Sequence, residues 1–237
     1  MTLGSIPVLM TFEGSAARAA ERGTILLYHG FTACKESGTK EFQSLAARGF
    51  LVVGPDNVGH GERRYPDFDR RFGAAEAARW EERFLEAVRA TADEVPQLLD
   101  QLEQRGLAHP DRVGISGISM GGYIAYGAML RDRRLRVAAP ILGSPLWNAP
   151  DSPHLTLDRF FPAAILSQNA GQDQSVPPQY ARDFHWHLRQ HYGADPERQR
   201  YVEFPDSGHF MGEEDWTLLW ANVVGWFDRF LAGETHG

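Results

Sequence analysis

The chain has 237 residues, of which 43% are hydrophobic and 23% are charged, a composition typical of a globular protein with one sizeable core. Its net charge is −7 and no basic cluster indicates nucleic-acid binding, while its single cysteine excludes an internal disulfide and a zinc–thiolate site. No apolar run approaches the roughly 20 residues of a membrane helix, and residues 1–10 lack a secretory signal pattern. We therefore expect one domain over residues 1–237, located in the cytoplasm without membrane contact.

In chain order, short apolar runs that fit buried strands alternate with segments that fit helices. The expected strands are residues 6–12 (an edge strand), 24–28, 50–53, 112–116, 137–142, 162–167 and 201–204. The expected helices are residues 41–48, 76–105 (divided at Pro96), 123–130, 178–190 and 214–231, and residues 13–23 and 57–75 are expected to be loops. This alternation predicts a mostly parallel sheet with helices on both faces and a ligand crevice at the carboxyl ends of the strands.

Residues 117–121 read G-I-S-M-G, which fits the pattern G-x-S-x-G. They lie between an expected strand and an expected helix, the context of a nucleophile elbow, in which a sharp turn exposes the serine hydroxyl. Glycines on both sides of Ser119 allow the strand and helix backbones to come close. The motif alone is weak, since about one chain in ten of this length would carry it by chance. An ordinary turn serine is therefore the alternative for Ser119.

A serine hydroxyl becomes a nucleophile when a histidine takes its proton and a carboxylate orients that histidine. His209 lies in a short glycine-flanked loop after the last expected strand, where such a base would be; a surface histidine is the alternative. Asp173 is the only acid in the run that follows the preceding strand, and a turn aspartate is the alternative there. Asp151 and Asp158 come before that strand, and Asp206 follows the strand that carries the base.

Acyl transfer also requires donors for the oxyanion that develops in the transition state. One should be the backbone N–H after the nucleophile, which belongs to Met120. The other should come from the loop after the first buried strand, where the backbone N–H of Phe31 is the natural candidate.

With nucleophile, acid, base and oxyanion loop in this order, the chain resembles enzymes of the α/β-hydrolase fold from about residue 24 to residue 231. The resemblance is carried by H-G-F at 29–31, D-N-V-G-H-G at 56–61, the elbow at 117–121, D-Q-S-V-P at 173–177 and G-H-F at 208–210. Within the fold it is most similar to small bacterial esterases of the YjfP or dienelactone-hydrolase-like type, on the phrase Y-H-G-F-T at 28–32. It departs from true dienelactone hydrolases, which have a cysteine at the position of Ser119.

The resemblance implies a serine carboxylesterase that cleaves small or short-acyl esters with Ser119, His209 and Asp173, and that needs no metal or organic cofactor. A peptidase, a thioesterase or a lactone hydrolase would use the same three residues. A non-catalytic member of the fold that binds small ligands or partners is a third hypothesis.

Many members of the fold carry an inserted cap domain, but residues 144–161 are too short and too rich in proline for one. The sequence therefore predicts a minimal or absent cap and an open site, which a neighbouring subunit of a homodimer could complete. Trp147, Phe160 and Phe161 are candidates for the wall of an acyl pocket, and ordinary core or loop aromatics are the alternative.

Three further groups of residues allow two interpretations each. Cys34 could be a catalytic thiol but is expected to be a loop residue. The histidines His185, His187 and His191 could bind a metal, but no H-E-x-x-H motif accompanies them, so a solvated or half-buried helix face is expected. An arginine cluster could bind an anionic substrate group but is expected to pair with Asp67 and Asp69: Arg63, Arg64, Arg70 and Arg71.

Overall fold

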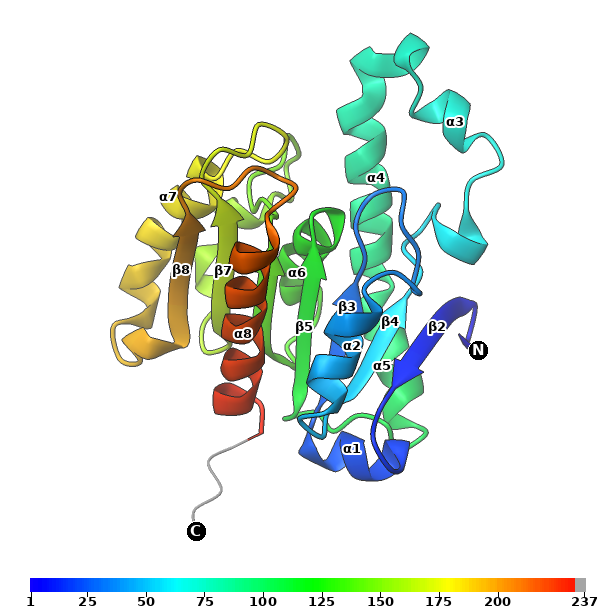
Figure 1. Cartoon of the computed structure of the whole chain (residues 1–237), viewed down its shortest axis with the longest axis vertical. Coiled ribbons are helices and arrows are strands. Elements are labelled where there is room, and N and C mark those ends of the chain that lie inside the picture. Colours follow the sequence, from blue (N-terminus) through cyan, green and yellow to red (C-terminus); the bar gives the residue numbers. More distant parts are fainter. Residues whose placement is uncertain (233–237) are drawn as a thin grey trace.

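The computed structural model describes residues 1–232, which form an eight-stranded sheet with helices on both faces (Figure 1). The strands lie in the order β1-β2-β4-β3-β5-β6-β7-β8; those from β4 to β8 run parallel, and β2 is antiparallel to both β1 and β4. The strands are β1 (Thr2–Leu3), β2 (Ile6–Thr11), β3 (Thr24–Tyr28), β4 (Leu51–Pro55), β5 (Val113–Ile118), β6 (Leu135–Ile141), β7 (Ala164–Ala170) and β8 (Gln199–Phe204). The predicted mostly parallel α/β sheet is therefore confirmed, although β1 rather than β2 occupies the edge.

Eight α-helices connect and cover these strands in the described part of the chain. They are α1 (Ala16–Arg22), α2 (Thr39–Ala46), α3 (Phe68–Arg71), α4 (Trp80–Asp93), α5 (Val95–Glu103), α6 (Met120–Arg131), α7 (Gln179–Leu188) and α8 (Glu213–Phe230). Short 3-10 turns are η1 (Gly61–Arg63), η2 (Ala74–Arg79), η3 (Pro153–Leu155), η4 (Leu157–Arg159), η5 (Arg189–Tyr192) and η6 (Pro196–Arg198).

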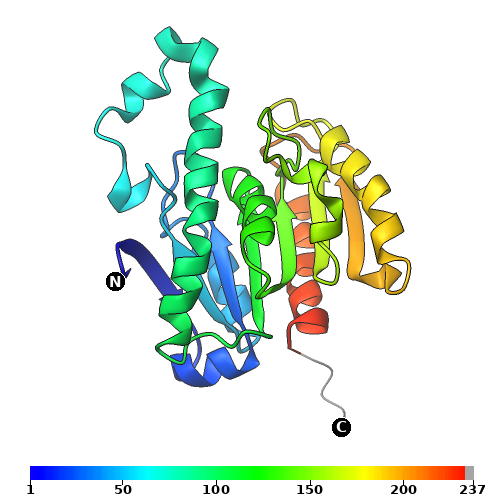
Figure 2. The same ribbon diagram turned by 180° about the vertical axis from the view of Figure 1, so that it is seen from behind.

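The alternation of side chains along each strand creates two separate cores. In β3, Leu26 and Tyr28 belong to one hydrophobic cluster, whereas Ile25 and Leu27 belong to the other, as the two-residue period of a strand requires. Helices α2 and α8 cover the face in front in Figure 1, and α4, α5 and α6 cover the opposite face, which is seen directly in Figure 2. Because both faces are buried, the strands are continuous apolar runs.

The helix break at Pro96 is confirmed, because α4 ends at Asp93 and α5 begins at Val95 with the proline in its first turn. The expectation of a loop at residues 13–23 is wrong, since α1 occupies most of it. Ser15 caps this helix by accepting a hydrogen bond from the backbone N–H of Arg18 at 3.3 Å. The alanine-rich helix buries Ala19 and Ala20, whose small side chains give only a weak periodic signal.

Residues 57–75, which were expected to be a loop, contain η1, α3 and the start of η2. Together with the first half of α4 they project beyond the carboxyl edge of the sheet (Figure 1); we call residues 57–87 the projection. Three of its arginines pair with Asp67 or Asp69 as expected: Arg64 with Asp69, Arg70 with Asp67, and Arg71 with Asp67 and also Glu86. Arg63 pairs instead with Glu94. These pairs make the cluster a structural feature of the projection rather than a free cationic surface.

His185 is a buried histidine on α7, with 2% of its surface exposed. Its Nε2 atom lies 2.7 Å from Ser167 Oγ, which also accepts a hydrogen bond from the Tyr126 hydroxyl at 2.5 Å, and its Nδ1 atom contacts the side-chain amide of Gln199. Burial lowers the pKa of His185 to about 3. The expectation of a solvated or half-buried helix face is thus wrong for His185, which is fully buried, and right for His187, which is exposed.

The buried His185 predicts a loss of stability in mild acid. An unfolded histidine is protonated below about pH 6.5, whereas folded His185 stays neutral, so stability is complete above that pH and falls by about 1.4 kcal/mol per pH unit below it. The measurement is urea unfolding at about pH 7 and pH 5. The loss of unfolding free energy between these pH values should be smaller in His185→Gln than in the wild type, and it should be unchanged in the surface control His187→Gln. Equal slopes in the wild type and His185→Gln would contradict the prediction.

Candidate active site

Ser119 lies at the carboxyl end of β5, immediately before α6, in the sharp turn that its sequence motif predicts. Its φ of 56° and ψ of −111° are unfavourable for a residue with a side chain and hold the hydroxyl outward. A Cβ atom on Gly117 would lie 2.5 Å from the Gly121 carbonyl, and one on Gly121 would lie 2.2 Å from the carbonyl oxygen of Tyr28. Both glycines are therefore required by close backbone contacts between β3, β5 and α6.

The structure brings Ser119, His209 and Asp173 together from three loops. His209 Nε2 lies 3.0 Å from Ser119 Oγ, and His209 Nδ1 lies 2.6 Å from Asp173 Oδ2. Because a carboxylate oxygen only accepts, Nδ1 carries the hydrogen, which leaves Nε2 free to accept from the serine hydroxyl. The Asp173 side chain is fully buried, whereas 18% of the His209 side chain is exposed. A carboxylate that orients a neutral histidine, which in turn accepts from a serine hydroxyl, is the arrangement in which a serine can be activated.

Backbone hydrogen bonds fix the loops that carry the acid and the base against each other. Asp173 Oδ1 accepts from the backbone N–H groups of Ser175 and Val176 at 2.8 and 2.9 Å, which orients its other oxygen toward His209. Gly171 N donates to Phe204 O at 2.7 Å, so the loop after β7 is tied to the end of β8. The relative placement of the acid and the base thus follows from the parallel pairing of their two strands.

The backbone N–H groups of Phe31 and Met120 flank the turn that carries Ser119. Neither amide donates a hydrogen bond to any group in residues 1–232. Phe31 occupies a turn closed by a hydrogen bond from Ala33 N to Gly30 O at 3.2 Å, and the next residue, Thr32, has a φ of 66°. Two free donors next to a partly exposed serine could receive an oxyanion.

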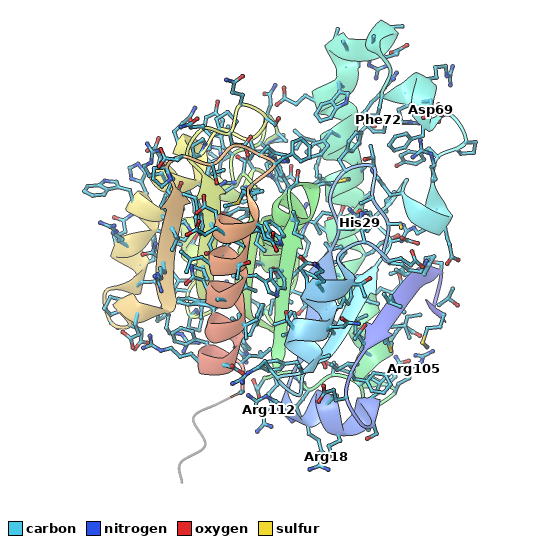
Figure 3. The ribbon with its side chains drawn as sticks, viewed as in Figure 1. Arg18, His29, Asp69, Phe72, Arg105 and Arg112 are labelled. Atoms are coloured by element: carbon cyan, nitrogen blue, oxygen red, sulfur yellow. The ribbon has the colours of Figure 1, made fainter. Side chains whose placement is uncertain are left out.

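His29 holds the peptide that presents the Phe31 N–H. Its Nδ1 donates to Gly30 O at 2.8 Å, and its Nε2 accepts from the backbone N–H of Asn57 at 3.1 Å. Because a trans peptide directs its C=O and N–H to opposite sides, fixing Gly30 O also fixes the Phe31 N–H. Burial lowers the pKa of His29 to about 4, which keeps this neutral tautomer at physiological pH. His29 lies between the sheet and the projection, which carries Asp69 and Phe72 (Figure 3).

A cavity of about 950 Å³ opens over Ser119. Its floor includes Ile118, Tyr123 and the predicted Trp147, whose indole N–H donates to Ser144 O at 2.9 Å. Two walls flank the serine: Trp80, Phe84 and Leu85 from α4 on one side, and Phe210, Met211 and Trp216 beside His209 on the other. The projection therefore contributes to the cover over the site together with the start of residues 144–161 and the segment from Gln174 to Tyr180.

Phe160 and Phe161, predicted to line an acyl pocket, do not line this cavity. The ring of Phe160 is fully buried and packs edge-on against Phe184, with centroids 5.0 Å apart. Phe161 packs against Tyr192 at 5.3 Å. Both precede the start of β7, at the opposite end of the sheet from the carboxyl edge where Ser119 lies. The alternative of core aromatics is correct for this pair.

Sequence reasoning missed the α4 wall, because the helical spacing of Trp80 and Phe84 predicts an apolar helix face without indicating that it lines the site. It also missed Tyr123, which lies one helical turn after Ser119 and contacts the Phe84 ring edge-on at 5.2 Å. The signal for Tyr123 was its spacing, since a residue four positions after the nucleophile lies on the same face of the helix.

No group of three or more His, Cys, Asp or Glu side chains within residues 1–232 is arranged to hold a metal ion. The free Cys34 is partly exposed in the loop before α2, where it lies 3.8 Å from the Ser37 hydroxyl. None of the helices in the described part of the chain is both long and apolar enough to span a bilayer.

Two curated bacterial proteins are similar to this chain in sequence. "Putative esterase YitV" of Bacillus subtilis (strain 168) is 24% identical over 97% of each chain. "Esterase YjfP" of Escherichia coli (strain K12) is 27% identical over 60% of this chain and 53% of its own length. Both names agree with the esterase-like resemblance of the sequence motifs.

The fold is likewise shared with solved structures. TT1662 from Thermus thermophilus superposes with a TM-score of 0.77 at 20% identity over 97% of both chains. A family model described as "Serine aminopeptidase, S33" matches residues 19–202, a range that contains Ser119, Asp173 and the loop of Phe31 but not His209. By its strand order, its elbow and this match, the chain belongs to the serine aminopeptidase S33 family of α/β-hydrolases.

Proposed function

We propose that this protein is a serine carboxylesterase in which Ser119 is the nucleophile, His209 the general base and acid, and Asp173 the residue that orients His209. The observation that carries the proposal is the unbroken hydrogen-bond chain from the Ser119 hydroxyl through His209 to the buried Asp173 carboxylate. The esterase names of the two curated relatives support an ester as the substrate.

In this mechanism Ser119 Oγ attacks the ester carbonyl carbon while His209 Nε2 takes the hydroxyl proton. The carbonyl oxygen becomes an oxyanion that accepts hydrogen bonds from the N–H groups of Phe31 and Met120. His209 then donates the proton to the leaving alkoxide, which departs as the alcohol and leaves an acyl-enzyme. Water, deprotonated by His209, attacks the acyl-enzyme and releases the carboxylic acid and free Ser119. This route uses no metal or organic cofactor.

A peptidase is the second candidate, because the matching family is described as serine aminopeptidases and a carboxylate, Glu81, lines the cavity where it could bind an amino group. Assays with p-nitrophenyl esters, thioesters, lactones and aminoacyl p-nitroanilides should separate these classes, and we expect the esters to react fastest. Preferential cleavage of the anilides would favour the peptidase. Failure of a fluorophosphonate probe to label Ser119 would favour a non-catalytic role.

We expect His29→Phe to lower kcat by about tenfold to a hundredfold with little change in KM, because the Gly30–Phe31 peptide loses its anchor. A trifluoromethyl ketone, which forms an oxyanion on Ser119, should lose affinity in parallel with kcat. The exposed His109→Phe substitution is the control and should retain both values. A change in KM alone, or an unchanged kcat, would argue against a positioning role for His29.

A further inference from the structure

The cavity has two sides, and the position of His209 indicates which side receives the alcohol of the ester and which receives its acyl group. The leaving alcohol must receive its proton from His209 Nε2 and therefore departs on the side of Phe210, Met211 and Trp216. The acyl group, on the other side of the attacked carbon, then points toward α4. Figure 1 shows the same division, with the loop before α8 and the upper part of α4 on opposite sides of the end of β5.

The acyl side is a rigid aromatic wall. The rings of Trp80 and Phe84 stack with centroids 5.0 Å apart and planes 12° apart, and Tyr123 meets Phe84 edge-on at 88°. Phe31 supports this wall from below, with its ring 5.4 Å from Trp80 and 6.0 Å from Phe84. The neighbouring Phe72 ring packs on both Phe31 and Trp80, at 4.9 and 6.3 Å. Because each of these rings packs against at least one other ring, the wall is a pre-formed aromatic surface that suits a ring better than a flexible chain.

Size and charge further limit the group that fits. A cavity of about 950 Å³ is at the upper end of small-molecule sites, far larger than an acetyl group requires. No lysine or arginine occurs among the described residues that line it, so nothing on this side would pair with a second carboxylate of the acyl group. Glu81 is the one acidic side chain among the described lining residues, and it too would disfavour an anionic acyl group. Aromatic surfaces of this kind bind aromatic rings, because ring pairs add attraction beyond the area that they bury.

We propose that the physiological acyl group is neutral and aromatic, of the arylalkanoyl class, with its ring bound against Trp80, Phe84 and Tyr123. This inference rests on the proposed esterase function, and it replaces the short acyl group expected from the sequence. The aromatic side chains of the projection are then determinants of specificity as well as cover for the site.

The first test keeps the alcohol constant and varies the acyl group. p-Nitrophenyl 3-phenylpropanoate should exceed p-nitrophenyl acetate in kcat/KM by about tenfold to a hundredfold, from the burial of one phenyl ring. It should also exceed p-nitrophenyl octanoate, whose chain is apolar but flexible. Preference for acetate, or for octanoate over 3-phenylpropanoate, would overturn the inference.

The second test uses two isomers that carry the same phenylethyl group on opposite sides of the ester. Methyl 3-phenylpropanoate places the ring on the acyl side, and 2-phenylethyl acetate places it on the alcohol side. We expect the first to be hydrolysed about tenfold faster in kcat/KM. Equal or reversed rates would overturn the assignment of the aromatic wall to the acyl group.

The third test is a matched pair of tryptophan variants. Trp80→Leu should lower the ratio of kcat/KM for the phenylpropanoate over the acetate by about tenfold, whereas Trp186→Leu, at a position 66% exposed on α7, should leave the ratio unchanged. The ratio is the proper readout because a disturbance of the nearby Phe31 loop would slow both substrates equally. An unchanged ratio in both Trp80→Leu and Phe84→Leu would overturn the inference.

Labelling of Ser119 by a fluorophosphonate distinguishes the two levels of the proposal. Labelling and ester hydrolysis without an aromatic preference would overturn this inference and leave the proposed function intact. No labelling and no hydrolysis of any ester would overturn both.

Discussion

Replacing Ser119 with alanine is expected to lower kcat for ester hydrolysis by about a millionfold, because the acyl-enzyme can no longer form. The remaining donors and the cavity would still bind substrate, so KM should change far less than kcat. The measurement is the release of p-nitrophenol from p-nitrophenyl 3-phenylpropanoate and acetate, together with fluorophosphonate labelling, which should disappear.

The prediction separates a nucleophile from a serine that only shapes the turn. Ser119 has a strained backbone whether or not it reacts, so removing its hydroxyl should leave the urea midpoint close to that of the wild type. Ser5→Ala, an exposed position in the turn between the two edge strands β1 and β2, is the control and should be fully active. Substantial activity in Ser119→Ala would exclude the proposed mechanism.

Ser119, His209 and Asp173 could be predicted from the sequence because the carboxyl ends of parallel strands lie at the same edge of a sheet. The elbow follows β5, the acid loop follows β7 and the base loop follows β8, so the carboxyl ends of these strands bring Ser119, Asp173 and His209 to one edge. The only acid in the loop after β7, and the histidine in the glycine-flanked loop after β8, were therefore sufficient clues, and the observed separations of 2.6 and 3.0 Å follow from that topology.

The projection could not be placed from periodicity, although its length carried a signal. Residues 76–105 would be about 45 Å long as a helix, whereas a strand of five to seven residues spans about 20 Å. A helix pair of that length must extend past the sheet at one end. Periodicity identifies the apolar face of Trp80 and Phe84 but not whether that face meets the sheet or a cavity.

Phe160 and Phe161 show the opposite error. They belong to the segment between two strands that reach the active-site edge, and this position alone suggested a pocket wall. The segment begins at the carboxyl end of β6 but must return to the start of β7, so its last residues lie at the far end of the sheet. Trp147, near the beginning of the same segment, does line the cavity.

Replacing Asp173 with asparagine is expected to lower kcat by about 10⁴-fold while preserving the loop. The asparagine carbonyl oxygen can still accept the backbone N–H groups of Ser175 and Val176, so the turn that Asp173 forms is retained. Its NH₂ group would then face His209 Nδ1 as a donor, which forces the ring hydrogen onto Nε2. That tautomer cannot accept the Ser119 proton.

The same substitution tests the alternative that Asp173 is only a turn aspartate, because such a role is unaffected by loss of the charge. The matched control is Asp206→Asn in the exposed loop before His209, where we expect wild-type kcat. Activity should be followed with p-nitrophenyl esters and stability with urea. Full activity of Asp173→Asn, or a comparable loss of activity in Asp206→Asn, would mean that Asp173 is not the acid. Asp206 would then be the next candidate, because it lies in the same loop after β8 as His209.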